Sequence, residues 1–123
     1  MTTVLLVDAP LAVRQALRAR LSLEPGLVIV GEADDAALAI SLARALEPDV
    51  VLLDAEAPDL DASSVVRALS RQNPSACIVV LSQHAAATSH ALKGTPAIVV
   101  GKHEGWAALV GAIRAAPRRP PGR

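Results

Sequence analysis

The chain has 123 residues and no net formal charge, and 52% of its residues are hydrophobic although only 1% are aromatic. This length fits one domain, and a chain so apolar is not intrinsically disordered. A single cysteine excludes an internal disulfide, and the absence of Phe and Tyr removes the stacking platforms that single-stranded nucleic-acid binders use. The apolar runs are too short for a transmembrane helix and the N-terminus lacks a basic signal-peptide region, so the expected location is the cytoplasm.

Five short apolar runs rich in β-branched residues alternate with five segments of helical spacing. The expected strands are 4–7, 27–30, 50–53, 78–81 and 97–100, and the expected helices are 11–22, 35–46, 62–72, about 85–93 and about 104–116. The apolar runs are continuous, which is typical of strands that helices cover on both faces. Asp61 is of the type that begins a helix, and Gly94 and Pro117 are of the types that end one.

This alternation predicts an α/β fold of the flavodoxin-like (βα)5 type. Right-handed βαβ crossovers give a doubly wound sheet of five parallel strands in the order 2-1-3-4-5. The domain is expected to span residues 1–116, and the Pro- and Arg-rich residues 117–123 are expected to be a tail or a truncated linker. The stretch 114–123 holds four Arg and no acid, so the rest of the chain is acidic by four charges.

Polar residues stand where the expected strands end. Asp8 follows the first strand, Asp54 the third and Ser82 the fourth, and Lys102 follows the fifth after one glycine. Ligand sites in such sheets lie at the carboxyl ends of the strands. We therefore expect two carboxylates, a hydroxyl and an ammonium group to meet in one pocket. Singly, each residue has a plainer interpretation, as a helix cap or a solvated side chain, but together they favour a functional edge.

The motifs resemble those of the receiver domains of bacterial two-component response regulators. The resemblance covers about residues 2–116, and it is carried by VLLVD (4–8), the segment 24–54, PDLD (58–61), VVLS (79–82) and Lys102. The segment 24–54 is most similar to the subclass whose receiver precedes a LuxR-type helix-turn-helix domain. Such a domain is not itself expected to be an enzyme.

The resemblance implies that a sensor histidine kinase transfers a phosphoryl group from a phosphohistidine to Asp54. Lys102 is similar to the lysine that pairs with the phosphoryl oxygens in this family. Ser82 is similar to the hydroxyl residue that bonds a phosphoryl oxygen and couples phosphorylation to a change of shape. The family also uses Mg²⁺, and the ligands implied here are Asp8, Asp54 and the backbone carbonyl of Glu56, in a loop that continues to Pro58.

Several positions depart from the family pattern. Ala9 stands where the family usually has a second acid that contacts Mg²⁺, so we expect Mg²⁺ binding to be weak or absent. The Glu56 carboxylate offers partial compensation if it turns inward, whereas the plainer alternative is that it faces solvent. Val99 replaces the usual aromatic switch residue, and the interval from Ser82 to Lys102 is slightly shorter than usual. The sequence therefore predicts an atypical, degenerate receiver with impaired or absent phosphorylation.

Three functions remain open from the residues. The first is a signalling receiver that regulates transcription through an attached or partner DNA-binding domain, contacting DNA only through a C-terminal domain that this chain lacks. The second is a phosphorylation-independent dimerisation or small-molecule-sensing module on the same scaffold. The third, a small α/β enzyme or cofactor carrier, is disfavoured because GxGxxG, GxxxxGK[ST] and GxSxG motifs are all missing. A homodimer is expected to form through the helices at 11–22 and 104–116.

The remaining candidate residues have structural interpretations. His84, His90 and His103 lack the spacing of a metal site and are expected at the surface. Cys77 opens an expected strand and is expected to be a small buried residue. Trp106 is expected to pack at the sheet edge or on a dimer face.

Overall fold

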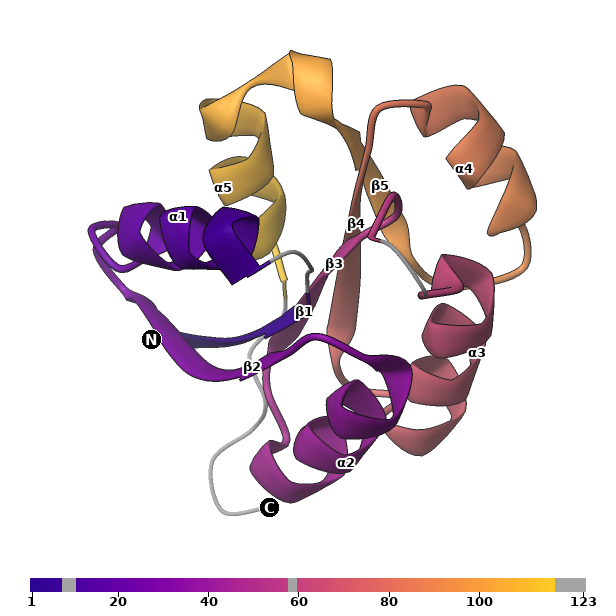
Figure 1. Ribbon diagram of the computed structural model, residues 1–123, viewed down its shortest axis with the longest axis horizontal. Coiled ribbons are helices and arrows are strands. Elements are labelled where there is room, and N and C mark those ends of the chain that lie inside the picture. Colours follow the sequence, from indigo (N-terminus) through magenta and orange to yellow (C-terminus); the bar gives the residue numbers. More distant parts are fainter. Residues whose placement is uncertain (8–10, 58–59, 117–123) are drawn as a thin grey trace.

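The five strands form one parallel sheet in the order that the sequence predicts. The computed structural model describes residues 1–7, 11–57 and 60–116. Its strands are β1 (Thr2–Val7), β2 (Leu27–Ala33), β3 (Val50–Asp54), β4 (Cys77–Ser82) and β5 (Ile98–Gly101), arranged β2-β1-β3-β4-β5 (Figure 1). The order confirms the flavodoxin-like (βα)5 fold.

Five helices cover the two faces of this sheet. They are α1 (Leu11–Leu21), α2 (Ala36–Leu46), α3 (Ala62–Gln72), α4 (Ala85–Ala91) and α5 (Trp106–Arg114). Figure 1 shows α1 and α5 on one face, and α2, α3 and α4 on the other. Among the described residues, no helix combines the length and the apolar character needed to cross a membrane.

The core is aliphatic and divides at the sheet. Every residue of β3 is buried, as expected for a central strand with helices on both sides. Leu53 packs on one side of the sheet in a cluster that includes Leu69 of α3. Leu52 packs on the other side in a cluster that includes Leu21 of α1 and Ile113 of α5. The period of two along the strand therefore sends alternate side chains to the two layers.

Short polar contacts begin the helices. The carboxylate of Asp35 accepts the backbone N–H of Leu38 at 2.8 Å and begins α2. Asp61 accepts the Ser63 backbone N–H at 3.2 Å and the Ser64 hydroxyl at 2.7 Å at the start of α3. These bonds satisfy N–H groups that have no partner inside a helix.

Several boundaries differ from those that the sequence predicts, and two of the differences have a clear local cause. The helix expected from about residue 104 begins instead at Trp106, because Lys102–Glu104 form a separate 3₁₀ turn. Gly105 interrupts the chain with a φ of 94°, a value that favours glycine. The second difference is that β2 continues to Ala33, because its last three residues pair with Leu5–Val7 of β1.

Trp106 packs on the aliphatic cluster under α1 and α5. Its indole N–H donates a hydrogen bond to the Glu24 carboxylate at 3.1 Å, and the Arg20 guanidinium lies 4.2 Å from the ring centroid. The three histidines are exposed. Cys77 is half-buried, and this burial raises the pKa of its thiol.

Candidate functional site

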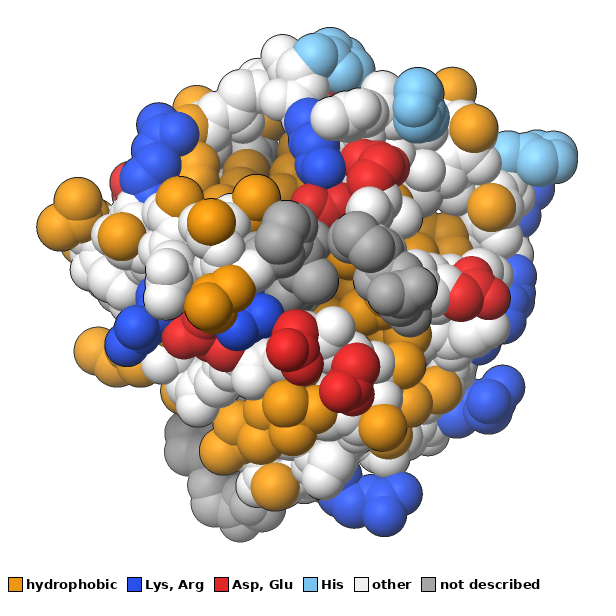
Figure 2. All heavy atoms as spheres, viewed as in Figure 1, with side chains coloured by type: hydrophobic (Ala, Val, Ile, Leu, Met, Phe, Trp, Pro, Cys, Tyr) orange, Lys and Arg blue, Asp and Glu red, His pale blue; other side chains and the backbone are white. Residues whose placement is uncertain are grey.

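Three polar residues meet at the carboxyl edge of the sheet. Asp54 is the last residue of β3, Ser82 is the last residue of β4, and Lys102 follows β5 directly. Strand register places them together, because Asp54 pairs with Leu81 and Ser82 pairs with Gly101. Figure 2 shows acidic side chains gathered near the middle of the face that it presents.

Lys102 and Asp54 form a two-oxygen ion pair. The Lys102 Nζ lies 3.0 Å from each carboxylate oxygen of Asp54. The side chain of Asp54 is only 10% exposed and that of Lys102 is 30% exposed. The backbone N–H of Glu56 donates a further hydrogen bond to Asp54 Oδ1 at 2.8 Å. The carboxylate is therefore fixed at the end of its strand by one ammonium group and one peptide group.

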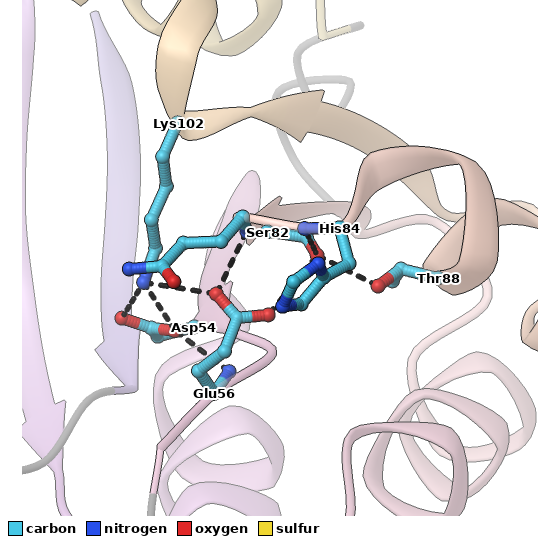
Figure 3. Close-up of polar contacts among 7 residues, drawn as sticks. Asp54, Glu56, Ser82, His84, Thr88 and Lys102 are labelled. Atoms are coloured by element: carbon cyan, nitrogen blue, oxygen red, sulfur yellow. Dashed lines mark hydrogen bonds and ion pairs between the residues drawn. The ribbon is translucent and has the colours of Figure 1, made fainter.

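The Glu56 carboxylate turns inward and joins the same cation (Figure 3). Its Oε1 lies 3.1 Å from Lys102 Nζ and accepts the backbone N–H of Gln83 at 2.8 Å. Its Oε2 accepts the hydroxyl of Ser82 at 3.0 Å. Glu56 thereby connects Lys102 to Ser82.

Ser82 is fully buried and its oxygen has three partners. Besides Glu56, it is bonded to the hydroxyl of Thr88 at 2.7 Å, and it accepts the backbone N–H of His84 at 2.9 Å. Thr88 lies in α4 and His84 precedes that helix. The Ser82 hydroxyl therefore ties the Asp54 pocket to the start of α4, as Figure 3 displays.

The ionisation of the site follows from these bonds. Burial acts to raise the pKa of Glu56, but hydrogen bonds from the Gln83 N–H, Lys102 and Ser82 outweigh it, so the pKa lies below its ordinary value. Burial acts to lower the pKa of Lys102, but its bonds to Asp54 and Glu56 outweigh that effect and raise it. At neutral pH, Glu56 is therefore an anion held by a cation.

The predicted residues fall into two groups. The structure brings together Asp54, Glu56, Ser82 and Lys102, whereas Asp8, Ala9 and Pro58 lie outside the described residues. Sequence reasoning missed Thr88 and the Gln83 peptide group. Thr88 lies six residues after Ser82, and once a helix is expected from residue 85, that spacing places its hydroxyl in the first turn beside the strand end.

The oxygen donors of the pocket match the preference of Mg²⁺ in type. Asp54 and Glu56 supply two carboxylates, and both are bonded to Lys102. Across residues 1–7, 11–57 and 60–116, no three His, Cys, Asp or Glu side chains are grouped so as to hold a metal ion.

A comparison with protein families settles what kind of domain this edge belongs to. The model of the response regulator receiver domain matches residues 4–114. The chain belongs to this family. It is therefore a receiver domain of the two-component response regulators, and the fold, the strand-end aspartate and the lysine after β5 are in the places that the resemblance implies.

Named relatives of this receiver domain include both enzymes and response regulators. A protein-glutamate methylesterase/protein-glutamine glutaminase of Anaeromyxobacter dehalogenans is 33% identical over 98% of the chain and 36% of its own length. The nitrate/nitrite response regulator protein NarP of Escherichia coli is 38% identical over 64% of the chain and 37% of its own length. The chain thus spans little more than a third of either relative.

Solved structures agree with the family. A LuxR-family two-component response regulator from Aurantimonas sp. SI85-9A1 superposes with a TM-score of 0.85 at 30% identity, covering 94% of this chain and 84% of that one. The response regulator domain of Thermotoga maritima CheB superposes with a TM-score of 0.82 at 24% identity, covering 94% and 96%. The receiver fold is therefore shared with LuxR-type regulators, as the segment 24–54 indicates.

Proposed function

We propose that Asp54 is the phosphoryl acceptor of this receiver domain, that a sensor histidine kinase is the donor, and that phosphorylation is attenuated. The observation that carries the proposal is the Lys102 ammonium group, 3.0 Å from both oxygens of Asp54. A carboxylate can approach an anionic phosphoryl group only where positive charge offsets the repulsion. Lys102 supplies such a charge at the atoms that would react.

The transfer itself is a simple displacement. An oxygen of Asp54 attacks the phosphorus of a phosphohistidine, a P–O bond forms, and the P–N bond breaks with its electron pair returning to the imidazole. The product is an acyl phosphate on Asp54. Lys102 pairs with the phosphoryl oxygens, and Ser82 donates its hydroxyl to one of them. Bound Mg²⁺ would add neutralising charge, held by the Asp54 carboxylate and, from the resemblance, by the backbone carbonyl of Glu56 and by Asp8.

Attenuation follows from residues that depart from the family pattern. Ala9 removes a carboxylate from the expected metal ligands, so Mg²⁺ is proposed to bind weakly. Val99 is half-buried against the core cluster under α2 and α3 and offers less movable area than an aromatic ring. The first change weakens charge neutralisation in the pocket, and the second weakens the coupling between the pocket and the surface around α4 and β5.

The output of the switch is proposed to lie in another domain. Regulation of transcription through an attached or partner DNA-binding domain is favoured by the structural match to a LuxR-family regulator. This domain would then be regulatory rather than an enzyme, and the cytoplasm is its proposed compartment. Residues 1–116 are proposed as the functional unit.

We further propose a homodimer through α1 and α5. On α1, the side chains of Leu11 and Val13 are 55% and 47% exposed. These two side chains, two positions apart, point to different sides of α1, and each is apolar area that a second copy can cover. Multi-angle light scattering is expected to give a dimer that Val13→Glu converts to a monomer. A monomer at all concentrations for the unmodified chain would contradict this proposal.

Acetyl phosphate labelling tests the acceptor. With Mg²⁺ and excess acetyl phosphate, intact-mass spectrometry is expected to show one added phosphoryl group in a minority of molecules, and Asp54→Asn is expected to show none. Stoichiometric labelling of the unmodified chain would contradict attenuation. Labelling that persists in Asp54→Asn would contradict the assignment of the acceptor.

A further inference from the structure

The Glu56 carboxylate is the anion on which the donors of this site converge. It binds the Lys102 ammonium group at 3.1 Å, the Gln83 peptide N–H at 2.8 Å and the Ser82 hydroxyl at 3.0 Å. The donors come from the end of β4, the residue after it, and the residue after β5. An acid that merely faced solvent would have no such set of partners.

The same donors are those that an acyl phosphate on Asp54 would need. Lys102 Nζ is 3.0 Å from both Asp54 oxygens, so a phosphoryl group attached to either oxygen emerges beside it. Ser82 is bonded to the carboxylate that Lys102 holds on its other side. Carboxylate and phosphoryl oxygens are recognised by the same charge-assisted hydrogen bonds. The Lys102 ammonium group and the Ser82 hydroxyl therefore form one anion-binding site, called here the phosphoryl seat. Either the Glu56 carboxylate or a phosphoryl group on Asp54 can occupy it.

The two anions cannot occupy this seat together. A serine hydroxyl has one proton to donate, and Ser82 is fully buried, so its proton cannot serve Glu56 and a phosphoryl oxygen at once. A phosphoryl group placed against the Glu56 carboxylate would also meet like charge at short range. Phosphorylation therefore requires the Glu56 side chain to leave.

We propose that Glu56 is an internal anion that occupies the phosphoryl seat of this receiver and must swing out before Asp54 accepts a phosphoryl group. This inference rests on the proposed function and deepens it. The Glu56 side chain is 30% exposed and belongs to the loop after β3, so it can turn into solvent without opening the core. If Glu56 occupies the phosphoryl seat, phosphorylation of Asp54 is attenuated for a reason that is independent of the missing acid at Ala9.

A role for Glu56 as a supporting metal ligand predicts the opposite effect. If the carboxylate helped to hold Mg²⁺, its removal would weaken Mg²⁺ binding and, with it, phosphoryl binding. If the carboxylate competes for the seat, its removal strengthens phosphoryl binding. The sign of one measured change therefore separates the two roles.

Trp106 provides a reporter in the pocket. It is the only tryptophan of the chain, and its ring lines the same cavity as Asp54 and Lys102. Calorimetry first gives the Mg²⁺ concentration that saturates each protein. Beryllofluoride, a phosphoryl mimic, is then titrated at that concentration while the fluorescence of Trp106 is followed.

Four proteins are compared: the unmodified chain, Glu56→Ala, Glu56→Gln and the control Asp34→Asn. Asp34 is an exposed acid just after β2, so its variant removes the same charge from a residue outside the Lys102 contacts.

The expected result is tighter binding of beryllofluoride by roughly tenfold or more in Glu56→Ala, since a seat that is free in only a tenth of molecules lowers apparent affinity tenfold. Glu56→Gln is expected to bind more tightly than the unmodified chain, because it keeps the shape and loses the charge. Asp34→Asn is expected to bind as the unmodified chain does.

Two outcomes would overturn the inference in distinguishable ways. Equal or weaker binding in both Glu56 variants, with binding clearly present in the unmodified chain, would overturn it and leave Asp54 as the acceptor. Absence of binding in all four proteins, together with absence of acetyl phosphate labelling, would overturn the proposed function and this inference with it.

Discussion

Replacing Leu52 with alanine is expected to lower the free energy of unfolding by about 2–5 kcal/mol. Leu52 is 1% exposed in the central strand and packs in the cluster that contains Leu21 and Ile113. The other buried members of this cluster are aliphatic side chains that already pack closely together, so the lost contacts are not replaced. Urea unfolding followed by circular dichroism measures the change.

Leu38→Ala is the matched control for this core truncation. Leu38 lies in α2 and is 41% exposed, so the same deletion removes little buried surface. We expect a change of at most about 1 kcal/mol, given that alanine is also a good helix former. Equal losses in the two variants would show that burial in β3 does not dominate stability.

Lys102→Met is the second substitution with a large expected effect. It leaves Asp54 and Glu56 without the cation that both bind. We expect the free energy of unfolding at pH 7 to fall by about 1–2 kcal/mol. This value is reduced because Lys102 is partly exposed to solvent. The same variant is expected to lose acetyl phosphate labelling, because the acceptor carboxylate then lacks the ammonium group that lies 3.0 Å from both of its oxygens.

The loss in Lys102→Met is expected to depend on pH at both ends of the range. In the unmodified chain the pKa of Glu56 is lowered, so its stabilising contribution is complete above the ordinary value of 4.5 and disappears as the pH falls through the folded value. The pKa of Lys102 is raised, so its contribution is complete below 10.5 and disappears as the pH rises through the folded value. The free energies of unfolding of the unmodified chain and of Lys102→Met, plotted against pH, should therefore differ by a constant amount between pH 4.5 and pH 10.5. The difference should shrink below and above this range.

A double substitution isolates the Lys102–Glu56 pair. Lys102→Met combined with Glu56→Gln is expected to lose less stability than the sum of the single losses, because the neutral amide no longer needs the cation. Urea unfolding of the four proteins at pH 7 gives the coupling. Strictly additive losses would contradict an ion pair of energetic consequence.

Much of the fold could be predicted from the sequence because its strands are continuous apolar runs. Residues 50–53 are apolar at every position, which is typical of a strand covered on both faces, and the helical segments between such runs favour parallel pairing with right-handed crossovers. The residues at which helices and strands begin and end could be predicted less well from the sequence. The start of α5 at Trp106 depends on the positive φ of Gly105 and on the Glu104 carboxylate, which accepts the Gly101 N–H. The helix propensities of residues 102–106 do not predict where the 3₁₀ turn ends and α5 begins.

The candidate site could be predicted by position but not by contact. The strand-end rule placed Asp54, Ser82 and Lys102 at one edge, and their register confirms that placement. The orientation of Glu56 stayed open in the sequence, because an acid two residues past a strand can face solvent or the pocket. Its direction is set by the Ser82 hydroxyl at the end of β4 and by the Gln83 peptide just after that strand. Only the folded arrangement brings those donors together.

Crystal structures of the unmodified chain, alone and with Mg²⁺ and beryllofluoride, test the central claim most directly. The chain alone should show the Glu56 carboxylate between Lys102 and Ser82. The complex should show beryllofluoride on Asp54, bonded to Lys102 and Ser82, with the Glu56 carboxylate turned away from both. A complex in which Glu56 keeps both contacts while beryllofluoride occupies Asp54 would contradict the account.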